Sequence, residues 1–196
     1  MSSARNVIAL LGLRASGKST LGPLLAQELG LAFIDLDEEL VRAALRAGVR
    51  AASAGELLAA RGEREFRAFE ADALRRVLEP GPRLVLATGG GVVERADNRA
   101  WLARATRGVL LCVAPALLAA RRAADPNPRP LLAGRDARAE AELLWRRREA
   151  WYRALAEVVL EVGEEPPGAL VARLRAALDS VRNPLLARRE TPDLHR

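Results

Sequence analysis

Short apolar runs alternate with longer amphipathic stretches along the whole chain, and this alternation is the strongest constraint on the fold. The apolar runs have the length of strands buried on both faces, and they span Val7 to Leu11, Leu31 to Ile34, Leu84 to Ala87, Val109 to Val113 and Val158 to Val162. Helical patterns lie at about 19–29, 37–47, 54–79 with a break near Gly62, 94–104, 115–124, 138–155 and 168–181. The pattern predicts a three-layer α/β/α fold with a five-stranded parallel sheet.

Two segments interrupt this rhythm. Residues 125–134 carry three prolines and a glycine, and we interpret about 124–137 as a mobile lid. Residues 183–196 are mostly polar and contain Pro184 and Pro192, which predicts a flexible C-terminal tail. With 196 residues in all, we expect one domain over residues 1–182.

The composition excludes several classes of protein. Half of the residues are hydrophobic and 29% are charged, as in a soluble globular protein without membrane spans. One cysteine, Cys112, and one histidine, His195, exclude an intramolecular disulfide, a multi-cysteine metal centre and a Ser-His-Asp triad. The N-terminus lacks the pattern of a signal peptide, so we expect a cytoplasmic protein. We also expect a monomer, because the sequence shows no large apolar stripe left for a partner.

The net charge of +6 raises the question of nucleic-acid binding. Nearly all of this charge is arginine in an Ala- and Leu-rich chain, which is typical of a GC-rich coding sequence, and aromatic stacking platforms are missing. We therefore expect no nucleic-acid partner. Lys18 is the only lysine, which indicates a position that needs a compact charge.

The strongest motif lies between the first apolar run and the first helical pattern. Residues 12–20 read G-L-R-A-S-G-K-S-T, which fits the P-loop pattern G-x-x-x-x-G-K-[ST]. Backbone N–H groups of such a loop bind phosphates, Lys18 reaches the β- and γ-phosphate oxygens, and the Ser19 hydroxyl ligates Mg²⁺. We predict a nucleotide site with contributions from Gly12, Ala15, Ser16, Gly17, Lys18, Ser19 and Thr20.

Two other strand ends carry candidate residues, since ligands of open α/β sheets bind beyond the carboxyl ends of the strands. Asp35 and Asp37 follow the second apolar run, and we assign Asp35 to the metal and Asp37 to the acceptor as a general base. The alternative is that one of them only caps the next helix. Gly89, Gly90 and Gly91 follow the third run and permit close approach of a ligand, or form only a tight turn.

Together these residues resemble the shikimate kinase family of P-loop kinases. The resemblance runs from Val7 to about Leu178 and includes a D-x-D after the second strand, here Asp35 and Asp37. Residues 62–70 match G-E-x-x-F-R-x-x-E, in which Arg67 would bind the carboxylate of the substrate and Glu70 would support it. The glycines 89–91 would touch the ring hydroxyl groups of the acceptor.

The resemblance also explains the proline-rich segment. Residues 129–134 match the lid motif R-P-L-L, which implies that Arg129 folds over the transferring phosphates. Arg148 matches the second carboxylate-binding arginine, in R-x-x-x-Y. Arg122 and Pro167 fall where the adenine is held in relatives.

The implied activity is transfer of the γ-phosphoryl group of ATP, with Mg²⁺, to the 3-hydroxyl of shikimate. Lys18, Asp37 and Arg129 would be catalytic in this reading. One alternative is a kinase for another hydroxy acid such as gluconate. Another is a sensing module that binds nucleotide or metabolite without turnover, and Ala15 favours it, because the family usually has glycine at that position.

Overall fold

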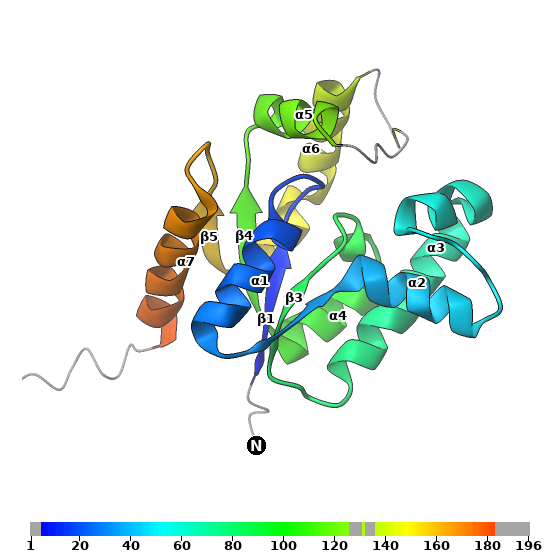
Figure 1. Cartoon of the computed structure of the whole chain (residues 1–196), viewed down its shortest axis with the longest axis horizontal. Helices are drawn as coiled ribbons and strands as arrows, with labels where there is room; N and C mark the ends of the chain where they lie inside the picture. The colour runs from blue at the N-terminus through cyan, green and yellow to red at the C-terminus, as the bar shows by residue number, and fades with distance from the viewer. Residues whose placement is uncertain (1–4, 126–130, 132–135, 183–196) are drawn as a thin grey trace, which may run out of the picture.

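The structure, a computed structural model, describes residues 5–125, 131 and 136–182 (Figure 1). It contains the expected five-stranded parallel sheet with helices on both faces. The strands are β1 (Val7–Leu11), β2 (Ala32–Asp35), β3 (Leu84–Ala87), β4 (Thr106–Cys112) and β5 (Ala156–Glu161). The helices are α1 (Lys18–Leu29), α2 (Leu36–Arg46), α3 (Ala54–Leu78), α4 (Ala96–Ala105), α5 (Pro115–Ala123), α6 (Ala137–Leu155) and α7 (Pro167–Arg182), with a 3₁₀ turn, η1, at Val92–Glu94.

The strands lie in the order β2-β3-β1-β4-β5, so β1 is central and all five of its residues are buried. Ile8 and Leu10 of β1 pack into the layer formed with α1 and α7, whereas Ala9 and Leu11 pack into the layer formed with α3, α4 and α6. This alternation follows from the two-residue period of a strand. Figure 1 shows α1 and α7 side by side on one face of the sheet.

Local sequence signals explain several element boundaries. The Ser53 hydroxyl accepts from Glu56 N at 3.1 Å and begins α3, while the Glu56 carboxylate accepts from Ala52 N at 2.7 Å. Gly62 has φ 75° and ψ 168° and divides α3 into two segments, as predicted. Gly22 lets α1 approach β2, because a Cβ there would lie 2.3 Å from the Phe33 ring.

Several predicted boundaries differ from the structure, and β5 begins at Ala156 rather than at Val158. β4 begins at Thr106 rather than Val109, because Thr106 and Arg107 pair with β1 although they are polar. The helix predicted at 94–104 is confirmed as α4, but it begins at Ala96, after the separate turn η1. The Arg99 guanidinium donates to the carbonyls of Val93 and Glu94 at 2.7 and 2.9 Å, which satisfies them outside a helix.

The topology gathers the candidate motifs at one edge of the sheet. The loop after β1, the carboxylates after β2 and the glycines after β3 all follow the carboxyl ends of adjacent parallel strands. Most of the predicted lid, and the whole predicted tail, lie outside the described residues. None of the helices in the described part of the chain has the length and apolar character needed to cross a membrane.

Candidate active site

A cavity of about 1360 Å³ lies at this edge of the sheet. It is bounded by the loop after β1, by α2 and α3, and by α5, α6 and the start of α7. Of the predicted site residues, Arg129 lies outside the described residues and Gly12 does not line the cavity. The others all line it: Ala15, Ser16, Gly17, Lys18, Ser19, Thr20, Asp35, Asp37, Arg67, Gly89, Gly90, Gly91, Arg122, Arg148 and Pro167.

The P-loop wraps tightly around the start of α1. Gly12 and Gly17 have φ values of 137° and 100°, which only glycine adopts readily. Ala15 has φ 64° and is the only described non-glycine residue with a positive φ. This left-handed conformation costs an alanine about 1–2 kcal/mol, so the loop keeps its shape at the expense of strain.

Lys18 lies within the loop and is 7% exposed. Its ammonium donates to Gly12 O at 3.0 Å, to Leu13 O at 2.7 Å and to Ser16 Oγ at 3.2 Å. These contacts hold the charge against the concave face of the loop, where phosphate oxygens would bind. The single lysine of the chain therefore sits where a compact, rotatable cation is useful.

Asp35 connects the P-loop helix to the end of β2. Its Oδ2 accepts from the Ser19 hydroxyl at 2.6 Å, and its Oδ1 accepts from Asp37 N at 2.9 Å, which caps α2. The capping alternative therefore applies to Asp35, which faces Ser19 as well. Asp37 lies in the first turn of α2, with its Oδ1 3.4 Å from the position of a Cβ on Gly89.

The glycines after β3 are required by close contacts as well as by the turn. A Cβ on Gly89 would lie 2.6 Å from Glu70 Oε1, and one on Gly91 would lie 2.1 Å from Arg67 Nη2. On Gly90 it would lie 3.0 Å from the backbone nitrogen of Arg14 in the P-loop. The absence of side chains thus lets α3 and the P-loop pack closely against this turn. A tight turn alone would not require glycine at all three positions.

Arg67 and Glu70 form a buried pair on α3. Arg67 Nη1 donates to both Glu70 oxygens at 3.1 and 3.0 Å, and Glu70 is 1% exposed. Burial lowers the pKa of Arg67, but the carboxylates of Glu70 and Glu94 outweigh it and raise that pKa above its ordinary value. Arg67 Nε is buried and has no acceptor among the described residues. A permanently charged guanidinium with an unused donor is suited to an anionic ligand.

Arg148 reaches the same region from α6 and is 3% exposed. Its Nη1 donates to Gly90 O at 3.1 Å, and its Nε and Nη2 donate to Glu94 Oε1 at 2.9 and 2.8 Å. The Tyr152 hydroxyl also donates to Gly90 O, and burial raises the pKa of this phenol, which keeps it protonated.

Neither Glu94 nor Tyr152 was predicted as a site residue. The only signal was that Tyr152 lies four residues after Arg148, on the same helix face.

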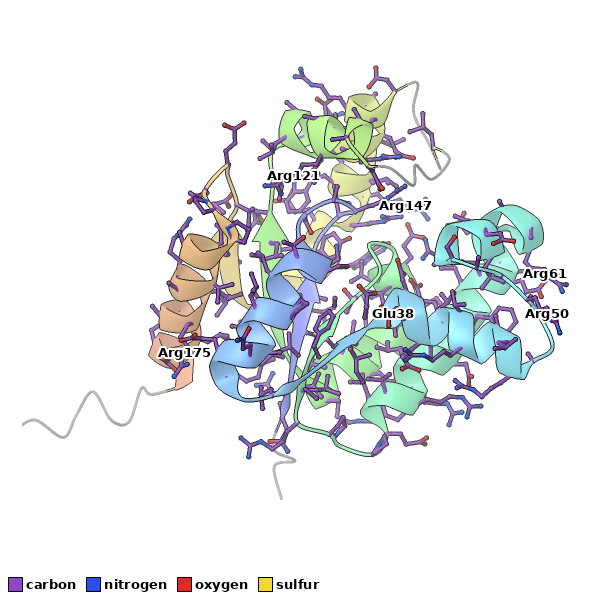
Figure 2. All side chains as sticks on the ribbon, viewed as in Figure 1. Glu38, Arg50, Arg61, Arg121, Arg147 and Arg175 are labelled. Atoms are coloured by element: carbon purple, nitrogen blue, oxygen red, sulfur yellow. The ribbon has the colours of Figure 1, made fainter. Side chains whose placement is uncertain are left out.

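The nucleotide end of the cavity carries two neighbouring arginines of α5. Arg122 pairs with Glu140 of α6, which is 2% exposed. Arg121, which the motifs did not indicate, donates to Ala15 O at 3.4 Å and to Gly163 O at 2.8 Å. Figure 2 shows Arg121 extending from α5 above the P-loop. Pro167 begins α7 nearby and lines the same cavity.

Metal-binding side chains are few here. Within residues 5–125, 131 and 136–182, no group of three or more His, Cys, Asp or Glu side chains is arranged to hold an ion. Ser19 and Asp35 nevertheless offer two adjacent oxygen donors beside the P-loop. This set fits Mg²⁺, which is bound by one or two protein oxygens together with nucleotide phosphates and water.

Comparisons with known proteins agree with this geometry. The family model "Shikimate kinase" matches residues 14–179. Shikimate kinase from Pseudomonas savastanoi pv. phaseolicola is 42% identical over 175 residues, covering 89% of this chain and 96% of that protein. The structure of shikimate kinase from Acinetobacter baumannii in complex with shikimate has a TM-score of 0.79 and 29% identity, over 91% of this chain and 95% of that one. The structure of shikimate kinase from Bacteroides thetaiotaomicron has a TM-score of 0.73 and 30% identity, over 88% and 98% of the two chains. On both the family model and these relatives, the chain belongs to the shikimate kinase family.

Proposed function

We propose that this protein transfers the γ-phosphoryl group of ATP to the 3-hydroxyl group of shikimate. One observation carries the proposal: a single cavity joins a P-loop to two arginines, the partly buried Arg67 and the buried Arg148. The P-loop suits the polyphosphate of a nucleotide, and paired guanidinium groups suit a carboxylate. The family relationship favours shikimate over gluconate as the acid.

At the nucleotide end, we assign the phosphates to the backbone N–H groups of residues 12–20 and to the Lys18 ammonium. Lys18 then exchanges contacts with loop carbonyls for contacts with the β- and γ-phosphate oxygens. Ser19 and Asp35 would hold Mg²⁺, directly or through water. When bound, this ion neutralises charge on the phosphates. Arg121, Arg122 and Pro167 are assigned to the far end of the nucleotide.

At the acceptor end, we assign Asp37 to the hydroxyl that attacks the γ-phosphorus. Asp37 lies beside Gly89 and two residues after the proposed metal ligand Asp35, which supports a role between the two substrates. It orients the hydroxyl and accepts its proton as the new P–O bond forms and the bond to ADP breaks. The glycines 89–91 leave room for the ring, and Arg67 and Arg148 bind its carboxylate.

Catalysis in this scheme is mainly positioning and electrostatic stabilisation, because phosphoryl transfer requires little covalent chemistry from the protein. Lys18 contributes a fixed positive charge near the transferred group. Arg129 would add a second positive charge, by its place in the lid motif, and its role stays a prediction.

The cytoplasmic location and the monomeric state also stay predictions.

A coupled assay of ADP release tests the proposal with shikimate, with gluconate and without an acceptor, each with MgATP. We expect turnover with shikimate only. The Lys18→Ala variant should lose about 10²- to 10³-fold in kcat, the usual cost of removing one transition-state donor. ATP binding without turnover on either acid would contradict the proposal and favour the sensing module. Turnover on gluconate alone would reassign the acceptor.

A further inference from the structure

Glu94 ends the 3₁₀ turn η1, directly after the glycine turn, and its role is not explained by any of the motifs. Its side chain is 11% exposed, although glutamate is among the residues least often buried. Two side chains of α4 hold the turn in place, since Arg99 and Asn98 donate to the carbonyls of residues 92–94. A partly buried carboxylate on a rigid turn beside the proposed acceptor site calls for an explanation.

The Glu94 carboxylate joins arginines from two different helices. Its Oε1 accepts from Arg148 Nε and Nη2 at 2.9 and 2.8 Å, and its Oε2 lies 3.7 Å from Arg67 Nη2. Arg147 Nε lies 3.5 Å from Oε1, but Arg147 is 61% exposed, so this contact is screened by solvent. Figure 2 shows Arg147 on the side of α6 that faces α2 and α3.

These contacts fix one edge of the Arg148 guanidinium. Of its five N–H donors, Nε–H and one on Nη2 are directed to Glu94, and one on Nη1 is directed to Gly90 O. The other N–H groups lie on Nη1 and Nη2, and the Tyr152 hydroxyl is also within hydrogen-bonding reach of this guanidinium. An N–H group held on a rigid guanidinium plane suits an oxygen of a carboxylate ligand.

Glu94 also balances charge in the absence of a ligand. Glu70 and Glu94 place carboxylates against Arg67 and Arg148, which offsets the cost of removing both arginines from water before any substrate binds, while burial raises the pKa of Glu70. Because carboxylates already face both arginines, selection of an acceptor carboxylate depends on where the other N–H groups of the arginines point. The orientation of Arg148 therefore matters more than the sum of the charges.

We propose that Glu94 is a positioning residue, which aligns Arg148 with Arg67 so that the remaining N–H groups of Arg148 face the carboxylate of the acceptor. This inference rests on the proposed function. The alternative is that Glu94 binds the arginines in the free enzyme at the place of the acceptor carboxylate. The acceptor would then have to displace Glu94 in order to bind. The two ideas predict opposite changes in acceptor KM when Glu94 is replaced.

Kinetics of Glu94→Ala and Glu94→Gln separate these ideas. Removing the alignment in Glu94→Ala should raise the KM for shikimate about tenfold or more, with kcat and the KM for ATP within about twofold of wild type. The carbonyl oxygen of glutamine can still accept from Arg148, so Glu94→Gln should stay within about threefold of wild type in all three constants. Asp97→Asn, at an exposed carboxylate paired with Arg95, is the matched control and should change none of them.

Three results would overturn the inference. A lower KM for shikimate in both variants would mean that the acceptor carboxylate displaces Glu94 from the arginines. An equal rise in KM in both variants would mean that only the charge of Glu94 matters. An unchanged KM in Glu94→Ala would mean that Glu94 has no role in acceptor binding. Failure of wild-type enzyme to use shikimate would instead overturn the proposed function. In that case a crystal structure of Glu94→Ala, or of Glu94→Gln if the alanine variant does not fold, still tests the alignment. Arg148 should leave Gly90 O in the alanine variant and keep that contact in the glutamine variant; any other result contradicts the alignment.

Discussion

The Ser19 hydroxyl donates to Asp35 Oδ2 at 2.6 Å and so links the first turn of α1 to the end of β2. The other oxygen of the same carboxylate caps α2 through Asp37 N at 2.9 Å. One side chain therefore fixes the distance between the proposed metal site and the proposed acceptor base. Its charge and its capping role can be separated by mutation, because asparagine caps helices about as well as aspartate.

We expect Asp35→Asn to keep the stability of the protein but to raise, by about tenfold, the free Mg²⁺ concentration needed for half-maximal rate. The amide is a weaker ligand for Mg²⁺ than a carboxylate. The measurement is kcat against free Mg²⁺ at fixed ATP. Asp35→Ala is the comparison, since it should also lose about 1 kcal/mol of stability with the cap. An unchanged Mg²⁺ requirement in both variants would leave Asp35 as a helix cap only.

Ala15→Gly should stabilise the protein by up to about 1 kcal/mol, because glycine adopts the φ of 64° without strain. Chemical denaturation of both proteins measures the difference. Ala150→Gly is the control: Ala150 is exposed in the interior of helix α6, where glycine costs about 0.5–1 kcal/mol. Loss of stability at both positions would show that Ala15 is not strained.

Gly91→Ala should weaken acceptor binding selectively. The new Cβ would lie 2.1 Å from Arg67 Nη2, so the guanidinium has to move out of the site. We expect the KM for shikimate to rise about tenfold or more while the KM for ATP changes little. A selective loss of ATP affinity would place Gly91 in the nucleotide site instead.

Cys112, at the end of β4, makes stability depend on pH in the alkaline range. Burial, followed by the nearby Glu161 carboxylate, raises the pKa of this thiol to about 11 from an ordinary value of 9.0. Between these two values the unfolded chain loses a proton that the folded protein retains, so the free energy of unfolding falls as pH rises. Cys112→Ala removes this contribution. Denaturation of both proteins at pH 8 to 11 should show the advantage of wild type over Cys112→Ala decreasing from pH 9 upward. A constant difference would mean that the thiol titrates normally.

The sheet and the P-loop were predictable because their signals are local. Each of the five apolar runs overlaps a strand, and the P-loop lies between β1 and α1. Asp35 and the glycines 89–91 were also placed correctly at one edge, since parallel strands bring their carboxyl ends together. The start of β4 was missed, because Thr106 and Arg107 enter the sheet by pairing with β1 rather than by being apolar.

The partners of the site arginines were less accessible to sequence reasoning. Glu94 contacts Arg148 across 54 residues of sequence, and a polar residue in a predicted helix carries no sign of that contact. Arg121 differs from Arg122 only by one step around α5, yet one reaches the P-loop and the other pairs with Glu140. Both outcomes depend on how helices pack, which the pattern of a single helix does not specify.

The claim that a buried arginine pair selects a carboxylate acceptor is tested most directly by comparing shikimate with its uncharged methyl ester. Wild-type enzyme should prefer shikimate by about 10- to 100-fold in kcat/KM, the value of a charge-assisted hydrogen-bonded contact. Arg148→Leu should lose most of this preference by losing activity on shikimate, while Arg146→Leu, at an exposed position on the same helix, should keep it. Equal use of the two compounds by wild type, or an undiminished preference in Arg148→Leu, would contradict the account.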